Sequence, residues 1–196
     1  VALLLGGEAF ATTLALAGPP EIVFDHRRDA CETWDVPDIG ARAFRTVDGT
    51  VTLIASHFVN RAMRGPDLDR VRQDCAVVFR GRQADAPDAF DDKGWIAAPW
   101  TTDGRTVFAL IHNEYQGHLR PTVCPAGNYM ACWGNAVTLA RSMDGGRTFQ
   151  GGGAENLVAA LPYRYRGDFG RHQGLFGPSN IVERDGHFYA FLDRKS

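Results

Sequence analysis

Carboxylate and imidazole side chains are concentrated in two short stretches of the sequence, DVPDIG at 35–40 and HNEYQGH at 112–118. Two carboxylates brought together can divide the roles of general acid and of base or nucleophile, and His or Tyr can act as a general base. The candidate catalytic residues are Asp38, His112, Glu114 and Tyr115. The alternatives are that Asp38 caps a turn or pairs with Arg42, and that Glu114 is an ordinary solvated side chain.

Other polar residues are candidate substrate contacts. They are Arg42, His57, Asn60, Arg61, His118 and Asn180. For His57, Asn60 and Arg61 the alternative is a solvated loop. The two histidines of 112–118 are spaced for neither a catalytic nor a structural zinc site. We expect no cofactor, and Ca²⁺ held by carboxylates and carbonyls stays an open alternative.

Three Asp-Gly hairpins are expected to position these residues. The segments 41–57, 98–114 and 178–194 each place an Asp-Gly pair between an apolar stretch and a β-branched or aromatic stretch. This arrangement favours a type I′ turn, which needs positive φ at both central residues. His57 and His112 each lie eight residues past the glycine of their turn, so they should occupy equivalent places, with Arg194 as the third equivalent.

A strand and a turn follow each of the first two hairpins, in 75–90 and in 135–149. In both turns an Asp precedes a Phe by five residues, Asp85 before Phe90 and Asp144 before Phe149. These aspartates follow the Asp-Gly aspartates by 37 and 41 residues. The near agreement predicts a repeated four-stranded unit, in which 83–90 is a degenerate copy of the later turn.

The later turn, SMDGGRTF at 142–149, matches the Asp-box pattern S-x-D-x-G-x-T-[FW] at every defined position. It resembles the sialidase-like β-propeller family, in which the box joins the third and fourth strands of a blade. Asp144 would accept backbone N–H bonds, Gly146 would supply an unusual φ, and Phe149 would pack between sheets. The resemblance implies an all-β fold, a β-propeller of five or six blades, of which this chain covers about two and a half.

The expected domain map has two parts. Residues 1–18 are a signal-peptide remnant, or alternatively a frayed apolar terminus, and 19–196 form the partial propeller with hairpins at 38–60, 95–118 and 177–196. EIVF at 21–24 would add a strand to the last blade. In a propeller, first-strand starts and second-strand ends meet at one channel mouth. The aromatic insertion at 150–176 would form a wall or lid there.

Two families of sugar-cleaving propellers resemble parts of the chain. GARAFRTVDGT at 40–50 looks similar to the first strand of sialidases, with Ile39 in the place of the family arginine. Five-bladed arabinanase-type glycosidases use an Asp in the first strand, which Asp38 matches. The segments 95–100 and 176–191 are similar to two further segments of those enzymes, with Phe176 in the place of the family glutamate.

The resemblance implies an exported carbohydrate-active protein, most simply a glycoside hydrolase with Asp38 and Glu114 as its carboxylate pair. The alternatives are a non-catalytic glycan- or protein-binding propeller, or a polysaccharide lyase with His112 or Tyr115 as its base. Lys plus Arg is 21 and Asp plus Glu is 23, with no basic block, so nucleic acid is a poor partner. No apolar run is long enough to span a bilayer.

The four cysteines give information on the cellular compartment of the protein. An even count allows three pairings, and the short loop between Cys124 and Cys132 favours a local bridge, which leaves Cys31 with Cys75. The alternative is four buried free thiols. Disulfides and the signal-like N-terminus together indicate a secreted or periplasmic protein.

Overall fold

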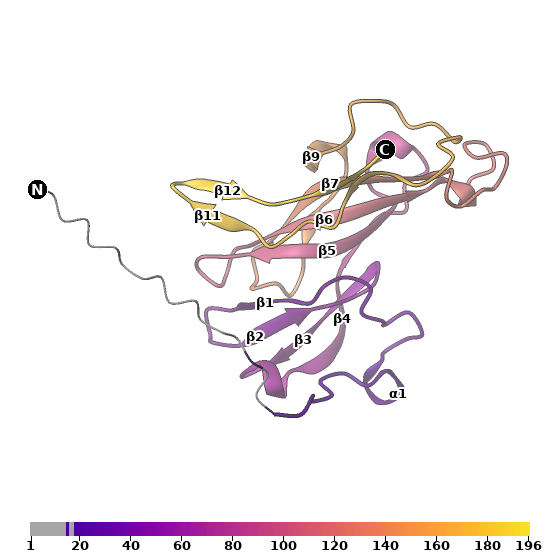
Figure 1. The fold of residues 1–196 in the computed structure, drawn as a ribbon. Helices are drawn as coiled ribbons and strands as arrows, with labels where there is room; N and C mark the ends of the chain where they lie inside the picture. The colour runs from indigo at the N-terminus through magenta and orange to yellow at the C-terminus, as the bar shows by residue number, and fades with distance from the viewer. Residues whose placement is uncertain (1–14, 16–17) are drawn as a thin grey trace, which may run out of the picture.

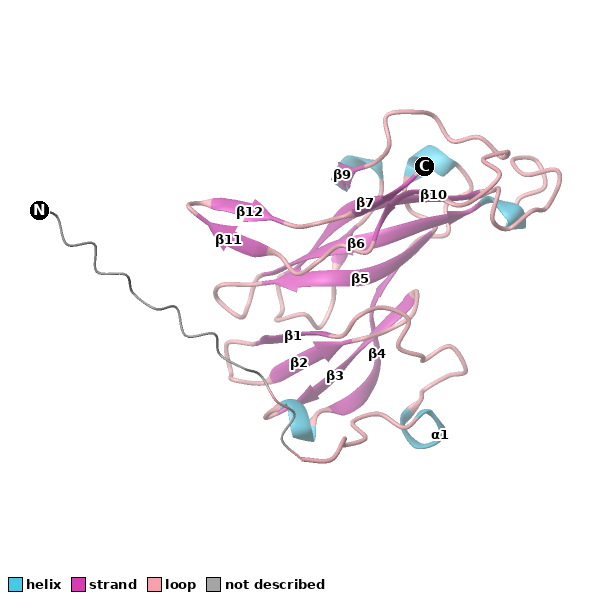
Figure 2. Ribbon diagram, in the orientation of Figure 1, coloured by secondary structure: helices cyan, strands magenta, loops and turns pink. Residues whose placement is uncertain are grey.

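The computed structural model describes Ala15 and residues 18–196, and the regular secondary structure of this part of the chain is mainly β-strand (Figures 1 and 2). The prediction of an all-β fold is confirmed. The helical segments in the described residues are α1 His26–Asp29 and the 3₁₀ turns η1 Leu68–Arg70, η2 Pro87–Ala89, η3 Gly117–Leu119 and η4 Ala154–Asn156. The expected signal remnant at 1–18 lies, apart from Ala15 and Gly18, outside the described residues.

The first sheet, sheet A, is a four-stranded antiparallel meander. Its strands are β1 Arg42–Arg45, β2 Val51–Ile54, β3 Val59–Gly65 and β4 Arg72–Arg80. They pair in sequence order, β1-β2-β3-β4, so each strand is joined to its neighbour by a short connection. The strands are rich in β-branched and aromatic residues, which suit a pleated, half-buried surface.

The second sheet, sheet B, begins in the same way. Its strands are β5 Lys93–Trp100, β6 Val107–Gln116, β7 Trp133–Ser142, β8 Gln150–Gly151, β9 Leu157–Ala159, β10 Gln173–Phe176 and β13 Asp193–Lys195. The main order is β13-β10-β7-β6-β5, with β8 and β9 also pairing with β7. A separate hairpin joins β11 Val182–Arg184 to β12 His187–Tyr189. In the described residues, no helix has the length and apolarity required to cross a membrane.

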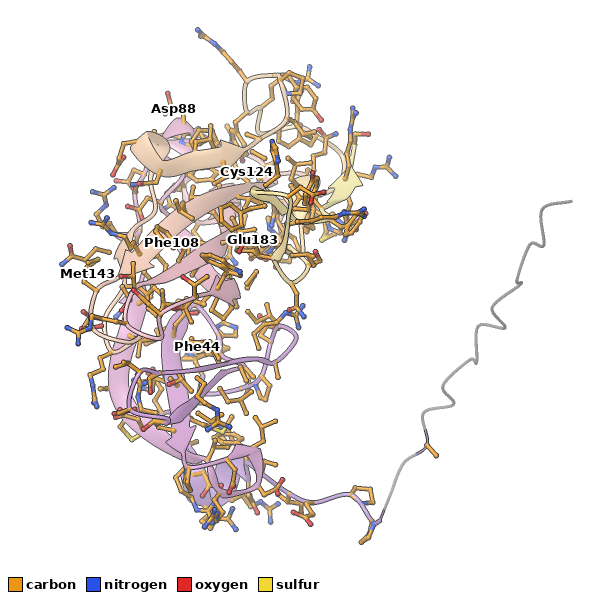
Figure 3. All side chains as sticks on the ribbon, turned by 90° about the vertical axis from the view of Figure 1, so that its left-hand side faces the viewer. Phe44, Asp88, Phe108, Cys124, Met143 and Glu183 are labelled. Atoms are coloured by element: carbon orange, nitrogen blue, oxygen red, sulfur yellow. A yellow bond between two sulfur atoms is a disulfide. The ribbon has the colours of Figure 1, made fainter. Side chains whose placement is uncertain are left out.

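Sheets A and B pack together over one apolar core (Figure 3). Phe44 of β1 lies at the junction of the two sheets and packs against this core. The buried members are Ile54, Ala62, Val78, Phe79, Ile96, Val107, Ala109, Ile111, Ala140 and Phe149. Leu110 and Val137 face the other side of sheet B, where Leu175 and Leu192 cover them. Strand β6 is therefore apolar on both faces along its middle, as expected for a strand covered on both sides.

The three Asp-Gly turns do form hairpin connections, but only one has the expected type I′ backbone. Asp185 and Gly186 have φ of 53° and 72°, as that turn requires. In the turn after β1 only Gly49 has positive φ, 85°. The carboxylate of Asp48 accepts hydrogen bonds from Thr46 Oγ1 at 2.5 Å and Thr50 N at 3.0 Å, which stabilises a longer loop instead. The type I′ prediction was wrong for the first two turns.

The Asp box lies between β7 and β8, and its residues act as the sequence predicts. The Asp144 carboxylate accepts bonds from Arg147 N at 3.0 Å and Thr148 N at 2.9 Å. Gly146 has φ of 79°, and a Cβ there would lie 2.5 Å from the ring of Phe44. Phe149 is buried in the core, and its N–H donates to Val78 O of sheet A at 2.8 Å. The box thus clamps sheet B to sheet A.

The proposed degenerate copy of the box at 83–90 is not one. Strand β3 follows β2 directly, so β4, not a third strand, contains residues 75–80. The segment 83–90 therefore connects sheet A to sheet B and contains η2. The prediction missed β3 because it placed Asn60 and Arg61 at the end of the second strand, with a solvated loop as the alternative. A register irregularity between Asn60 and Ala62 disturbs the alternation of that strand.

The segment before sheet A packs as coil. Residues 21–24 form no strand, contrary to expectation, and Val23 and Phe24 pack against the small cluster of Val51, Met63 and Val71. Both expected disulfides are present, Cys31–Cys75 and Cys124–Cys132. The first ties this segment to β4, and the second closes the loop before β7.

Candidate functional site

Polar and aromatic residues from both sheets meet at one end of the molecule. We call eight of them the carboxylate cluster. They are Asp38, His57, Lys93, Trp95, His112, Glu114, Gln116 and Asn135. They come from the segment before β1, the segment after β2, the start of β5, the end of β6 and the start of β7. In antiparallel sheets these ends lie side by side.

Asp38 and His57 reach the cluster from sheet A. The Asp38 carboxylate accepts a hydrogen bond of 3.1 Å from Trp95 Nε1, and it lies 3.5 Å from His57 Nε2. The ring of His57 packs edge-on to Trp95, with centroids 5.5 Å apart. The side chain of Asp38 is 49% exposed, so its carboxylate is open to a ligand. No pair with Arg42 forms: Arg42 Nη1 donates to Ala41 O.

Alternation along β6 places His112, Glu114 and Gln116 on one face. His112 Nε2 lies 3.2 Å from Glu114 Oε1, and Gln116 Nε2 donates to Glu114 Oε2 at 3.2 Å. Lys93 Nζ donates to Gln116 Oε1 at 2.7 Å, and the amide of Asn135 lies 3.0 Å from His112 Nε2. Glu114 is only 8% exposed, so its carboxyl is held firmly by its neighbours.

His112 Nε2 lies within hydrogen-bond distance of both Glu114 Oε1, at 3.2 Å, and the Asn135 amide nitrogen, at 3.0 Å. The tautomer of the ring decides whether Nε2 donates to the carboxylate or accepts from the amide. A buried carboxyl hydrogen-bonded to an imidazole can act as a general acid or base. Trp95 lies beside both centres, because its ring centroid is 5.9 Å from that of His112.

Burial sets the charge of the imidazoles around the cluster. Desolvation lowers the pKa of His57 from its ordinary 6.5, although Asp38 and Glu114 partly oppose this. Burial also lowers the pKa of His118 and His172. The amine of Lys93 has a lowered pKa for the same reason. The three histidines are therefore neutral near pH 7 and present one donor and one acceptor nitrogen each.

An aromatic surface extends from the cluster. His112 lies 5.7 Å from Phe176, Phe176 lies 6.1 Å from Trp133, and Trp133 stacks on Tyr129 at 4.9 Å between centroids. His118 meets the edge of Tyr129 at 4.7 Å. In the described part of the chain, no three His, Cys, Asp or Glu side chains are grouped so as to hold a metal ion.

Some of the predicted site residues lie elsewhere. Tyr115 points to the opposite face of β6 from Glu114, donates to Asp85 O at 2.6 Å and packs edge-on to Tyr165. Because neighbouring side chains on a strand alternate, Tyr115 and Glu114 lie on opposite faces of β6. Asn180 is exposed and takes part in none of the hydrogen bonds that define the cluster. The aromatic insertion contacts both faces: Tyr165 packs against Tyr115, whereas Phe176, at its end, lies against His112 on the face of Glu114.

Asn60 and Arg61 hold the structure together. The Asn60 amide donates to Gly94 O at 2.7 Å and Phe79 O at 3.2 Å, and its oxygen accepts from Ile96 N at 2.7 Å. Asn60 therefore bridges the two sheets from a fully buried position. Arg61 pairs at 2.6 Å with both Glu32 and Asp35.

Four members of the cluster were not predicted from the sequence: Lys93, Trp95, Gln116 and Asn135. A signal for Trp95 exists, because it lies eight residues before Asp103 just as His112 lies eight after Gly104. Residues equally far from a hairpin turn face each other, and Trp95 does pair with His112. Comparison with protein-family models, curated proteins and solved structures gives no match.

Proposed function

We propose that the chain is part of an Asp-box β-propeller of the sialidase-like class, with sheet A and the β5–β9 part of sheet B as consecutive blades. Both start as antiparallel meanders, which supports a repeated unit. The first hairpins lie side by side, since Val47 N donates to Gly104 O at 3.0 Å. The β11–β12 hairpin would begin a third blade, in a ring of five or six.

The function best supported is hydrolysis of a glycosidic bond, by an exported protein, at the carboxylate cluster. The supporting observation is that Asp38 and Glu114, 76 residues apart in the sequence, both lie near Trp95. Asp38 accepts a hydrogen bond from Trp95 Nε1, and Glu114 contacts His112, whose ring packs against that of Trp95. Sugar-cleaving enzymes use two such carboxyl groups with an aromatic wall between or beside them. The two disulfides agree with folding in an oxidising compartment.

The chemistry would divide between the two carboxyls. A proton on the Glu114 carboxyl would pass to the glycosidic oxygen as its bond to the anomeric carbon breaks. The Asp38 carboxylate would stabilise the positive charge at that carbon and take the proton of the water whose oxygen adds there. The neutral His57 would orient Asp38, from which its Nε2 lies 3.5 Å.

The test is turnover of a panel of glycans by the complete gene product. Glu114→Gln and Asp38→Asn should each lower kcat by about a hundredfold or more. Glu155→Gln is the matched control, because the Glu155 side chain is 64% exposed and outside the cluster. Glycan binding without turnover would contradict hydrolysis and favour a binding propeller. Unsaturated products would instead favour a lyase with His112 as base.

A further inference from the structure

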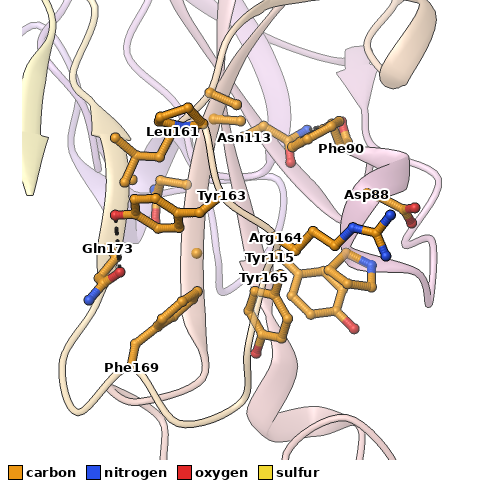
Figure 4. Close-up of a pocket in the computed structure, with 17 residues that line it drawn as sticks. Asp88, Phe90, Asn113, Tyr115, Leu161, Tyr163, Arg164, Tyr165, Phe169 and Gln173 are labelled. Carbon is orange, nitrogen blue, oxygen red and sulfur yellow. Dashed lines mark hydrogen bonds between the residues drawn. The ribbon is translucent and has the colours of Figure 1, made fainter. Parts of the chain in front are cut away.

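A hollow of about 540 Å³ (Figure 4) is lined by Tyr115 and Asn113 of β6, which lie on the opposite face of that strand from Glu114. The segment 87–90 forms one side and the segment 160–174 the other. Tyr115 lies in its wall, Asp38, His57 and Glu114 do not line it, and Asn135 is the member of the carboxylate cluster that does. A hollow of this size is large enough for one or two sugar rings.

Its shape suits a flat ring. Gly134 and Ala136 of β7 form a floor of small residues, while Tyr163, Tyr165 and Phe169 rise around it. A Cβ on Gly134 would lie 3.2 Å from the ring of Tyr165, so a larger residue would close the slot. Aromatic faces above a floor of small residues accommodate the apolar face of a pyranose.

The polar groups around the hollow are planar, and their charges cancel. Arg164 and Asp88 supply one positive and one negative side chain. Asn113 Nδ2 donates to Phe90 O at 2.6 Å, and Gln173 Oε1 accepts from the Tyr163 hydroxyl at 3.2 Å. These bonds leave Asn113 Oδ1 and Gln173 Nε2 free to meet a ligand as acceptor and donor. Such a set matches hydroxyl groups, which both donate and accept.

The aromatic wall is fixed before any ligand arrives. The Tyr165 hydroxyl donates to Cys132 O at 2.7 Å, and Phe169 N donates to Ala131 O at 2.9 Å. Tyr165 and Phe169 also pack edge-on, with centroids 5.2 Å apart. The Cys124–Cys132 disulfide anchors the segment to which both are bonded. A preformed wall lowers the entropic cost of binding.

We propose that this hollow is a binding site for one neutral hexopyranose residue, separate from the Asp38 and Glu114 carboxylates and without a catalytic role. The ring would stack on Tyr163 and Phe169, and its hydroxyls would bond to Arg164, Asp88 and Asn113. Because Arg164 and Asp88 offset each other, the charged side chains of the lining give an anionic sugar no advantage over a neutral one. This site depends only on its own residues, so it does not require the proposed hydrolysis.

The experiment is saturation-transfer NMR on the full chain. The probes are the methyl glycosides of glucose, galactose and mannose, with glucuronate as the anionic comparison. At least one methyl glycoside should receive transfer, and glucuronate should not exceed it. Tyr163→Ala should weaken binding about tenfold, the loss of one stacking contact. Tyr189→Ala, on the exposed β12, is the matched control and should bind as the wild type.

Further variants make the result decisive. Arg164→Ala removes polar contacts and leaves the aromatic wall in place, so it should also weaken binding while the amide spectrum stays native. Glu114→Gln should bind the methyl glycoside as tightly as the wild type. The proposal is overturned if no methyl glycoside binds, if glucuronate binds more tightly, if Tyr163→Ala has no effect, or if Glu114→Gln abolishes binding.

Discussion

Trp95 and Asp38, 57 residues apart in sequence, are joined by a hydrogen bond of 3.1 Å from the indole Nε1 to the carboxylate. The bond links β5 of sheet B to the segment that enters sheet A. His57 lies against both partners, 3.5 Å from Asp38 and 5.5 Å from the ring of Trp95. A substitution of any one of the three should therefore alter the contacts of the other two.

Removing the charge of Asp38 should change the titration of His57. Burial holds the pKa of His57 below 6.5, and the Asp38 carboxylate opposes this lowering. Asp38→Asn should therefore lower the pKa further, which an NMR titration of the His57 ring protons would measure. Asp88→Asn, on the other side of sheet B, serves as the control. An unchanged or higher pKa in Asp38→Asn would refute the contact.

The half-buried histidines should make the protein less stable in mild acid. His57, His118 and His172 all have pKa values lowered by burial. The unfolded chain then binds protons first, so stability should be full above about pH 6.5 and decline as the pH falls below it. Urea unfolding between neutral pH and pH 5 measures this. Stability that rises over the same range would be inconsistent with neutral buried rings.

The contribution of Asp144 to stability should be lost in stronger acid. Although burial raises the pKa of Asp144, hydrogen bonds from Ser142 and Thr148 outweigh it and lower the pKa to about 2. The turn's stabilisation is therefore present above about pH 4 and is lost as the pH falls toward 2. Asp144→Ala should lower the free energy of unfolding by about 2 kcal/mol at pH 7. Asp168→Ala, at an exposed carboxylate, should have little effect.

Asn60 should be a major determinant of stability. Asn60→Ala would leave Gly94 O and Ile96 N without their side-chain partner in a fully buried place. We expect a loss of about 3 kcal/mol in urea unfolding. Asn180→Ala, at an exposed position, should stay within about 0.5 kcal/mol of the wild type. Equal effects from the two substitutions would mean that Asn60 does not bridge the sheets.

The two disulfides should differ in their contribution. They close sequence separations of 44 residues for Cys31–Cys75 and 8 residues for Cys124–Cys132. Loop-closure entropy gives losses of about 4 and about 2.5 kcal/mol when each pair is replaced by serine. Thermal unfolding of the two double variants tests the order. A larger loss from the short loop would point to the packing of Tyr165 and Phe169 instead.

Local features could be predicted from the sequence because their causes lie within a few residues. The Asp box needs only Asp144, its own turn amides and two glycines, and the short loop between Cys124 and Cys132 favours that bridge. The hairpins follow from Asp-Gly pairs between β-formers. The turn type was less secure, because the side chain of Asp48 stabilised another loop.

The spatial grouping of these polar residues was predicted in part. Asp38, His57, His112 and Glu114 do meet, because the hairpin register places them at one end of their strands. Tyr115 was wrongly grouped with Glu114, since the strand period of two sends neighbours to opposite faces.

By itself the sequence predicted the β-structure, the places of the Asp-Gly turns, the favoured disulfide pairing and the end of the sheets where polar residues gather. Only the tertiary structure decided that Asn60 and Arg61 belong to β3, that Trp95 joins the two sheets, and that Tyr115 faces a separate hollow. The reason is physical: backbone turns are governed by neighbouring residues. Which face of a strand meets which partner depends on register and packing between segments far apart in the chain.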